Sequence, residues 1–283
     1  MTIQNTKHKP KIIAFTLQKG GVGKTSCVVN LAAALSFMKR SRYSRYRNKI
    51  LVIDMDAHAT ATDNLGISDA GYQTIYDAIT DKCNFDDIIR EVKYEFGRYG
   101  FCQIDIAPSG DTYASRLEDL KDTQLLSKAL NNSKRIMEYD YIFIDCPPES
   151  NIMLKNAYMV CDYFIFPTLA RKSSYKNIGR TYDELARLYE RLSANNIVGT
   201  IINNYETSNS EQYFKEMIVS NEKLKCFNTI IPHSKIFDES EIFNMPVIFL
   251  HRNKHEIQPV FNAFVSLAKE FLVRMKMINQ KGE

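Results

Sequence analysis

The stretch FTLQKGGVGKTSC, residues 15–27, joins an apolar run to a helix-like run through a cluster of glycines. Small residues let backbone N–H groups approach an anion, and the amino end of the following helix adds its dipole. The stretch therefore predicts a phosphate-binding loop between a buried strand and a helix. The residues expected to bind a nucleotide there are Gly20, Gly21, Val22, Gly23, Lys24, Thr25 and Ser26.

Two lysines flank the glycines of this loop. Lys24 is placed to reach the β- and γ-phosphates of a nucleotide, and the Thr25 hydroxyl is placed to coordinate Mg²⁺. One lysine is enough to hold the phosphates, so the loop pattern alone leaves the purpose of Lys19 open.

The composition is that of an ordinary globular chain. Of its 283 residues, 45% are hydrophobic and 25% are charged, which supplies enough apolar material for a full core. No apolar run approaches the ~18 residues of a membrane span, the first residues lack a signal-peptide core, and the six cysteines form no C-x-x-C pair. We therefore expect a cytoplasmic protein with reduced thiols. Its net charge of +4 permits a polyanionic partner without requiring one.

Short apolar runs alternate with amphipathic stretches, which is typical of a parallel sheet covered by helices on both faces. The runs predicted as strands are residues 11–17, 49–55, 102–108, 141–145, 163–168, 197–203 and 227–232. The stretches predicted as helices include residues 25–38, 123–137, 181–192 and about 255–277. The chain shows no linker and no fold-scale repeat. We predict one α/β domain over residues 1–283, a P-loop NTPase with a mostly parallel twisted β-sheet, a flexible arm at 1–10 and a basic loop at 39–49.

Carboxylates stand at the ends of two predicted strands. The segment ILVIDMDAHATAT, residues 50–62, ends its apolar run with Asp54 and Asp56, which therefore lie on one side of the sheet's edge. The segment YIFIDCPPE, residues 141–149, ends its apolar run with Asp145. An aspartate at the end of a strand is weak evidence for a functional residue by itself, because turns favour aspartate in general. Asp145 is a stronger candidate because it follows a phosphate loop in the chain and begins a D-C-P-P turn.

One position departs from the common phosphate-loop pattern G-x-x-x-x-G-K-[ST], because Gln18 stands where the first glycine belongs. The remaining K-G-G-V-G-K-T resembles the deviant Walker A motif of the ParA/MinD family of dimeric ATPases, and more closely its ParA branch. The resemblance extends from about residue 11 to 275. It implies that the cofactors are ATP and Mg²⁺. It also implies that Lys19 is the signature lysine, which reaches across a homodimer interface to the partner's nucleotide and neutralises charge during phosphoryl transfer.

The same resemblance assigns the carboxylates. It implies that Asp56 orients or activates the attacking water, that Asp54 lies near the Mg²⁺ shell, and that Asp145 holds Mg²⁺ through water. The expected catalytic residues are Lys19, Lys24 and Asp56, and the expected metal site is Thr25, Asp54 and Asp145.

The loop after Asp56 departs from the family pattern D-x-D-P-Q-G-N. The proline, glutamine and glycine of that pattern are replaced here by Ala57, His58 and Ala59. These replacements put the conformation of the loop and the rate of ATP hydrolysis in question. For His58 an ordinary loop residue is the favoured interpretation, and a catalytic role is the alternative.

Two later segments also resemble the family. IIPHSKIFDESEIFNMPVIF, residues 230–249, follows the pattern I-P-R-N-V-R-L-S-E-A…P-V, and GTIINNYE, residues 199–206, ends where relatives carry a base-contacting residue. The resemblance implies that Asn204 contacts adenine and that the backbone near Pro232 closes the pocket. An ordinary loop asparagine explains Asn204 equally well. NKHE, residues 253–256, superficially matches the guanine-reading motif of GTPases. It follows the late PVIFL run, where the resembling family has a variable basic loop, so we interpret the match as a coincidence and expect ATP, not GTP.

The loop KRSRYSRYRNK, residues 39–49, carries six cations in eleven residues, with two tyrosines between them. Such a loop suits non-specific nucleic-acid binding, but a solvated charged loop is an equally good explanation. ParA-type ATPases bind DNA without sequence preference as ATP-bound dimers, mostly through basic residues in the C-terminal half. The candidate DNA contacts are Arg42, Arg45, Arg47, Lys215, Lys223, Lys225, Lys235, Arg252 and Lys254.

The resemblance implies a DNA partition ATPase. Its ATP-bound dimer would coat nucleoid DNA and leave it when a centromere-bound ParB-type partner stimulates hydrolysis. The alternative is a MinD-like regulator of division-site placement, whose branch ends in an amphipathic membrane helix. Here the apolar side of the last helix, with Phe271, Leu272, Met275 and Ile278, is better explained by packing on the domain, so no stable membrane association is expected.

Two further classes fit less well. A nitrogenase-reductase-like electron carrier needs cysteines that bridge an iron–sulfur cluster, and Cys102 and Cys146 lack that family's glycine-rich surroundings. A bacterial tyrosine kinase of this group normally carries a C-terminal tyrosine cluster, whereas no tyrosine follows Tyr213 here.

Overall fold

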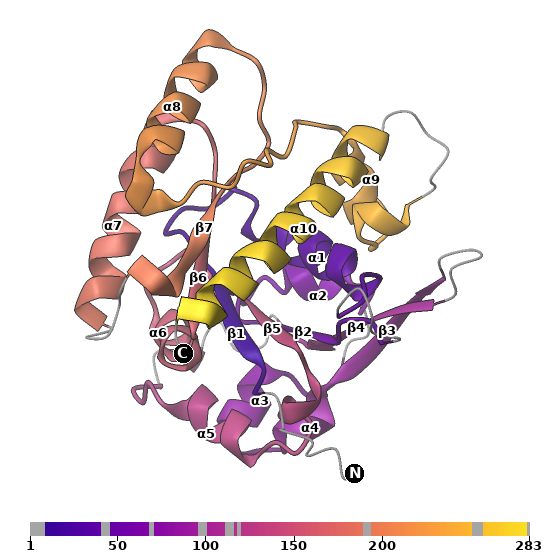
Figure 1. The fold of residues 1–283 in the computed structure, drawn as a ribbon. Helices are drawn as coiled ribbons and strands as arrows, with labels where there is room; N and C mark the ends of the chain where they lie inside the picture. Colours follow the sequence, from indigo (N-terminus) through magenta and orange to yellow (C-terminus); the bar gives the residue numbers. More distant parts are fainter. Residues whose placement is uncertain are drawn as a thin grey trace.

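One seven-stranded β-sheet runs through the middle of the molecule (Figure 1). The computed structural model describes residues 9–40, 46–67, 71–95, 101–110, 116–117, 120–188, 194–250 and 257–281. The strands are β1 (Lys11–Phe15), β2 (Ile50–Asp54), β3 (Arg90–Glu95), β4 (Phe101–Ala107), β5 (Tyr141–Asp145), β6 (Tyr163–Thr168) and β7 (Ile197–Ile202). They lie in the order β3-β4-β2-β5-β1-β6-β7, and all neighbours are parallel except β3 and β4. The predicted mostly parallel α/β fold is confirmed.

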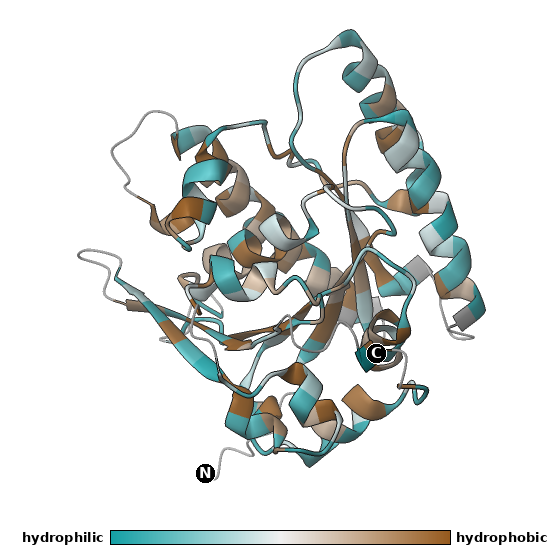
Figure 2. Cartoon of the chain, turned by 180° about the vertical axis from the view of Figure 1, so that it is seen from behind, coloured by the Kyte–Doolittle hydropathy of each residue, from teal (hydrophilic) through white to brown (hydrophobic). Residues whose placement is uncertain are grey.

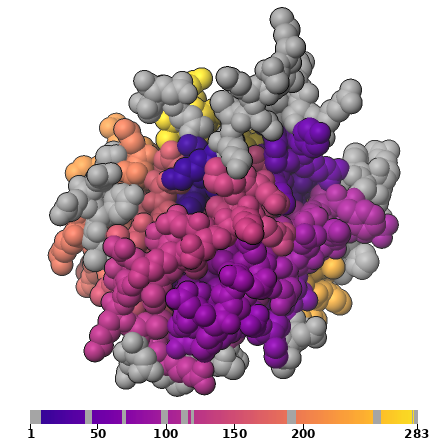
Figure 3. All heavy atoms as spheres, turned by 90° about the horizontal axis from the view of Figure 1, so that it is seen from below, coloured from indigo at the N-terminus to yellow at the C-terminus, as the bar shows by residue number. Residues whose placement is uncertain are grey.

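Helices cover both faces of this sheet (Figure 1). One face carries α1 (Lys24–Ser36), α2 (Thr60–Asn64), α9 (Ile236–Ile242) and α10 (Ile257–Lys281). The other carries α3 (Ile75–Ile79), α4 (Phe85–Ile88), α5 (Leu125–Asn132), α6 (Ile152–Val160) and α7 (Lys172–Leu188), with α8 (Asn209–Ser220) beside α7. The 3₁₀ turns are η3 (Ile136–Glu138), η4 (Ala194–Asn196), η5 (Glu222–Leu224) and η6 (Val247–Phe249). Seen from below, the segment with α3, α4 and α5 forms much of the surface (Figure 3).

The central strands are buried on both sides because their residues alternate between two apolar cores. In β1, Ile12 and Ala14 belong to the core under α5 and α6, whereas Ile13 and Phe15 belong to the core under α1 and α10. Hydrophobic strands accordingly fill the middle of Figure 2, and hydrophilic residues line the outer turns of the helices. This double burial explains why the strands are continuous apolar runs in the sequence.

Six of the seven predicted strands are confirmed, and the seventh is wrong. Residues 227–232 run beside the end of β7, but only Pro232 forms a bridge, to Tyr205. The strand that was not predicted is β3. Its sequence REVKYE alternates charged and apolar residues from Glu91 on, as an edge strand does. The prediction missed β3 because it depended on continuous apolar runs.

The predicted helices are present with different bounds. The helix predicted at 123–137 ends at Asn132, and the one predicted at 181–192 is the second half of α7, which begins at Lys172. The last helix is α10, Ile257–Lys281. The predicted ends at 189–192 and 255–256 lie outside the described residues.

The described ends of the basic loop at 39–49 form a short paired ribbon. Lys39 and Arg47 form an antiparallel bridge, and the buried Asn48 side chain donates to carbonyl oxygens at the end of α1. The base of the loop is therefore held against the domain. Arg42 and Arg45 lie outside the described residues, as do residues 1–8 of the predicted arm.

The last helix packs on the domain, as predicted, and it does so along α1 (Figure 1). Phe271 and Met275 are buried, and Leu272 and Ile278 pack against the same core. In the ranges that the structure describes, no helix is long and apolar enough to span a membrane.

Shortening Phe271 tests this packing. Its ring meets the rings of Tyr141 and Phe143 at centroid distances of 5.2 and 5.7 Å. We expect Phe271→Ala to lower the free energy of unfolding by about 3–5 kcal/mol, because it leaves a cavity in the core. Val273 on the same helix is 50% exposed. Val273→Ala is the control and should change that free energy by less than about 0.5 kcal/mol in urea unfolding. Equal effects of the two variants would contradict the packing of α10.

Candidate functional site

The glycine-rich loop turns sharply between β1 and α1. Gly21 and Gly23 have φ values of +67° and +82°, in the left-handed region that favours glycine. A Cβ at Gly23 would lie 1.9 Å from Nδ2 of Asn203. That nitrogen donates to the Val22 carbonyl at 3.2 Å, so the end of β7 holds the loop in place. The predicted strand–loop–helix context of a phosphate site is therefore present.

Lys24 opens α1 and points into this loop. Its side chain is 6% exposed, and Nζ donates to the Lys19 carbonyl at 3.1 Å. Burial lowers its pKa, and the nearby Asp145 carboxylate opposes that shift. The ammonium group thus lies inside the turn that the glycines form, where phosphate oxygens can replace the carbonyl.

Two aspartates meet beneath the loop. Asp54 and Asp145 are paired across the neighbouring strands β2 and β5, and both are buried. Thr25 Oγ1 donates to Asp145 Oδ2 at 2.6 Å. The carboxylates and hydroxyl that sequence assigned to a metal site therefore lie together at the sheet edge.

The two carboxylates of this pair repel each other in a buried place. Burial and the neighbouring Asp54 carboxylate raise the pKa of Asp145 above its usual range, and burial raises the pKa of Asp54. Among the described residues, Asp145 Oδ1 is a buried oxygen without a hydrogen-bond donor. Oxygen ligands of this kind suit Mg²⁺ or one of its bound waters, so Asp145 and Thr25 fit the predicted ion.

Asp54 also organises the loop that follows it. Its Oδ2 accepts hydrogen bonds from the backbone and hydroxyl of Thr62, at 2.9 and 2.8 Å, and its Oδ1 accepts one from the Asp56 N–H at 3.1 Å. Ser109 donates to the Asp56 carbonyl at 2.5 Å. The side chain of Asp56 is 17% exposed. His58 donates its N–H to Asp56 Oδ1 at 3.1 Å.

The second lysine of the loop lies against its own chain. Lys19 Nζ donates to the hydroxyls of Ser173 and Ser174, at 2.7 and 2.9 Å, in the first turn of α7. Partial burial and the nearby Arg171 guanidinium lower its pKa. A desolvated ammonium beside a second cation is the kind of group that an additional anion stabilises.

The residues predicted for the base pocket come together at the end of β7. Asn204 has a left-handed backbone (φ 51°), and its Oδ1 lies 2.8 Å from His233 Nδ1. Pro232 bridges to the residue that follows Asn204. The adenine contact itself stays a prediction. Residues 253–256 lie outside the described residues.

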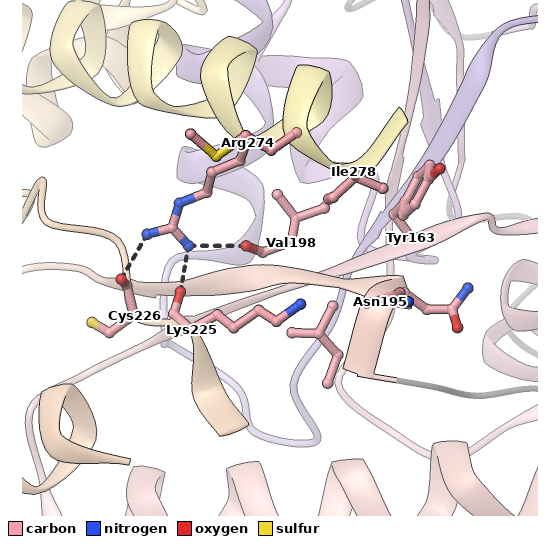
Figure 4. A pocket seen from close by; sticks show the side chains of 10 residues that line it. Tyr163, Asn195, Val198, Lys225, Cys226, Arg274 and Ile278 are labelled. Carbon is pink, nitrogen blue, oxygen red and sulfur yellow. Dashed lines mark hydrogen bonds between the residues drawn. The ribbon is translucent and has the colours of Figure 1, made fainter. Parts of the chain in front are cut away.

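The described DNA candidates come from different segments of the chain. Arg47 donates to the Phe101 carbonyl, and Lys215 lies over the Tyr205 ring. Lys225 lines a cavity of about 400 Å³ near the start of β7, where Arg274 donates to backbone carbonyls, including that of Val198 at 2.9 Å (Figure 4). Of the remaining candidates, Lys223 and Lys235 are exposed, and Arg252 and Lys254 lie outside the described residues.

Three supports of the site were not predicted from the sequence. These are Asn203, which holds the glycine loop, the hydroxyls of Ser173 and Ser174, which hold Lys19, and Thr62, which holds Asp54. Only Asn203 carried a signal, as a second polar residue at the end of a strand. The others lie in segments whose polar residues are ordinary for helix starts.

The two cysteines considered for an iron–sulfur cluster are buried in different places. Cys146 packs in the core under α5 and α6, whereas Cys102 packs in the core on the other face of the sheet. Neither of them lies at the surface of the chain, where a cluster shared by two subunits needs its ligands.

Known proteins share this combination of sequence and geometry. A family model described as an AAA domain matches residues 10–198. Soj of Bacillus subtilis, a sporulation initiation inhibitor protein, is 26% identical over 275 residues, 92% of this chain and 97% of the Bacillus protein. The chromosome partitioning protein ParA of Myxococcus xanthus is 24% identical over 243 residues, 84% of this chain and 81% of that protein. The chain belongs to this AAA-domain family, and the partition proteins Soj and ParA are among the proteins it is similar to.

Solved structures agree with the ParA-type fold. A plasmid partition protein from Borrelia burgdorferi B31, bound to AMPPNP, superposes with a TM-score of 0.72 and 26% identity over 93% of this chain and 100% of that one. The cell division ATPase MinD of Pyrococcus furiosus superposes with a TM-score of 0.70 over 92% of this chain and 97% of that one. Its identity is 21%, so this second likeness concerns the fold alone.

A substitution at Gly23 tests the close contact between the glycine loop and Asn203. We expect Gly23→Ala to destabilise the ParA-type fold by about 1–3 kcal/mol, because it forces a Cβ into Asn203 and strains a left-handed backbone. Gly20→Ala is the matched control, because a Cβ there meets nothing within 4 Å. The control should change the free energy of unfolding by less than about 0.5 kcal/mol in urea without nucleotide. Equal stability of the two variants would contradict the contact with Asn203.

The buried aspartate pair predicts a pH dependence. Because folding raises the pKa of Asp145 above its unfolded value near 3.9, the folded chain keeps a proton that the unfolded chain has lost. The contribution of Asp145 therefore becomes more destabilising as the pH rises above about 4. Asp145→Asn should gain stability relative to the wild type between pH 5 and pH 8, by up to about 1.4 kcal/mol per pH unit.

The measurement is urea unfolding of both proteins at several pH values without Mg²⁺. Asp183→Asn, at an exposed position of α7, is the control and should show a flat difference. A flat difference for Asp145→Asn as well would mean that the pair is not desolvated. Added Mg²⁺ should stabilise the wild type at pH 8 more than it stabilises Asp145→Asn, because the ion loses a carboxylate in the variant.

Proposed function

We propose that this chain is an ATP-dependent DNA partition ATPase. The observation that carries the proposal is the loop with two lysines above a buried carboxylate pair, with Thr25 bound to Asp145, in a chain similar to Soj and ParA. The Borrelia partition protein with AMPPNP supports ATP as the nucleotide. Hydrolysis to ADP and phosphate, with weak intrinsic turnover, is part of the proposal.

The residues of the chain have separate roles in this proposal. The backbone of residues 20–26 and the Lys24 ammonium bind the phosphates, and Thr25 with Asp145 holds Mg²⁺, with Asp54 beside them. When bound, Mg²⁺ neutralises phosphate charge. Asp56 orients the attacking water. Asn204 and the backbone at Pro232 contact the base.

Lys19 connects ATP binding to dimerisation. In the single chain its ammonium is bound by the uncharged hydroxyls of Ser173 and Ser174. A triphosphate of a second subunit offers that ammonium a charged partner, and charged hydrogen bonds are the stronger ones. We infer that Lys19 leaves α7 when two ATP-bound chains meet, and that hydrolysis reverses the exchange.

The ATP-bound dimer then binds DNA without sequence preference through phosphate contacts. Two subunits present each basic group twice, which strengthens binding to a long polyanion. A ParB-type partner on the centromere would stimulate hydrolysis and release the dimer, so that the protein associates with the nucleoid in its ATP state.

DNA binding in defined nucleotide states tests the proposal. With ATP and Mg²⁺ we expect binding of a non-specific duplex that weakens steeply with salt, and at least about tenfold weaker binding with ADP, because one subunit offers fewer contacts. Lys19→Ala should bind as weakly with ATP as the wild type does with ADP. Lys176→Ala, an exposed lysine on α7, is the control for lost charge. Equal binding in all states would remove the nucleotide switch.

Asp56→Ala separates binding from chemistry in the same assay. This variant should keep ATP-dependent DNA binding and lose hydrolysis, because Asp56 lies outside the phosphate loop. Normal hydrolysis by Asp56→Ala would show that another group orients the water.

A further inference from the structure

The carboxylate of Asp56 is held from one side. Both hydrogen bonds that it accepts from described residues fall on Oδ1, and both come from His58. The backbone N–H donates at 3.1 Å, and the ring nitrogen Nδ1 lies at 2.9 Å. Because an ionised carboxylate only accepts, Nδ1 must carry the proton in this contact.

The backbone around Asp56 is restrained independently of His58. The Asp56 N–H donates to Asp54, the Asp56 carbonyl accepts from Ser109, and the N–H of Ala59 donates to the same carbonyl at 3.0 Å. The main chain therefore keeps its place without the imidazole. The ring adds a restraint on rotation of the carboxylate about the Cβ–Cγ bond.

That rotation matters for the proposed chemistry. In phosphoryl transfer the protein contributes mainly position, and the group that orients the water must present one oxygen in a defined direction. With Oδ1 held by the two donors of His58, Oδ2 is the oxygen directed to the water. The ring is 77% exposed, whereas the Asp56 side chain that it contacts is 17% exposed.

We propose that His58 is a positioning residue for hydrolysis, which fixes the Asp56 carboxylate through its Nδ1–H so that Oδ2 faces the attacking water. The inference rests on the proposed ATPase function and on the role of Asp56 in it. It assigns no proton transfer to His58. It gives a role to a residue that stands where the resembling family has glutamine.

Three substitutions separate the donor from the bulk of the ring. His58→Leu keeps roughly the size of the side chain and removes the ring donor, while the backbone N–H donor to Oδ1 remains. His58→Asn places an amide N–H close to the position of Nδ1, and His58→Gln restores the family residue on a longer side chain. The measured quantities are kcat and KM for ATP at saturating Mg²⁺, together with the unfolding temperature and the affinity for a fluorescent ATP analogue.

We expect His58→Leu to lower kcat about tenfold, because a misdirected carboxylate costs rate and not binding. Its KM, its nucleotide affinity and its unfolding temperature should stay at the wild-type values. His58→Asn should recover most of kcat, whereas His58→Gln should recover less because its amide starts one bond further out. A role in stability alone would lower the unfolding temperature and nucleotide affinity of His58→Leu together, which would overturn the proposal.

Two other outcomes are also decisive. If the wild type hydrolyses ATP and His58→Leu turns over within twofold of it, the positioning role is wrong and the ATPase function stands. The role is equally wrong if His58→Leu is slow and His58→Asn is no faster, because the donor then makes no difference. A wild type that binds but does not hydrolyse ATP, with Mg²⁺ and DNA present, would overturn the proposed function itself and His58 with it.

Discussion

Two aspartates buried side by side are the constraint on which the rest of this site depends. Asp54 and Asp145 end neighbouring strands, and the parallel register places them next to each other at the sheet edge. Two neighbouring buried carboxyl groups cannot both ionise without a compensating cation. The chain supplies the buried ammonium of Lys24 and the hydroxyl of Thr25, and among the described residues Oδ1 of Asp145 has no donor. The folded chain is thus prepared for a divalent cation.

The surroundings of the pair come from segments that are far apart in the chain. Thr62 and Ser109 hold the loop after β2, and Asn203 holds the glycine turn from the end of β7. All of these contacts are hydrogen bonds at the carboxyl edge of the sheet, where an α/β fold gathers its loops. The arrangement leaves the glycine loop preformed, so a nucleotide does not have to order it.

Lys19 is the one cation of the phosphate loop that points away from the loop. It contacts α7 of its own chain through two neutral hydroxyls. A contact of this strength keeps a long side chain in one place, yet a phosphate can displace it at moderate cost. This balance is what a reversible, ATP-dependent dimer requires. The ring of His58 contacts the carboxylate of Asp56 and restrains it.

The sequence alone determined the strand–loop–helix unit at residues 11–36, the parallel sheet, and the placement of Asp54 and Asp145 at its edge. These features depend on local motifs and on the alternation of apolar strands with amphipathic helices, and both patterns are visible among residues that are close in the sequence. It did not reveal β3, because an edge strand buries only one side, and it wrongly placed a strand at 227–232. The tertiary structure alone decided which hydroxyls bind Lys19, that Asn203 closes on Gly23, and that His58 reaches Asp56 Oδ1. The first two contacts join residues that are far apart in the chain, so packing decides their distance. The third joins near neighbours, and it depends on a side-chain orientation that the residue types alone do not show.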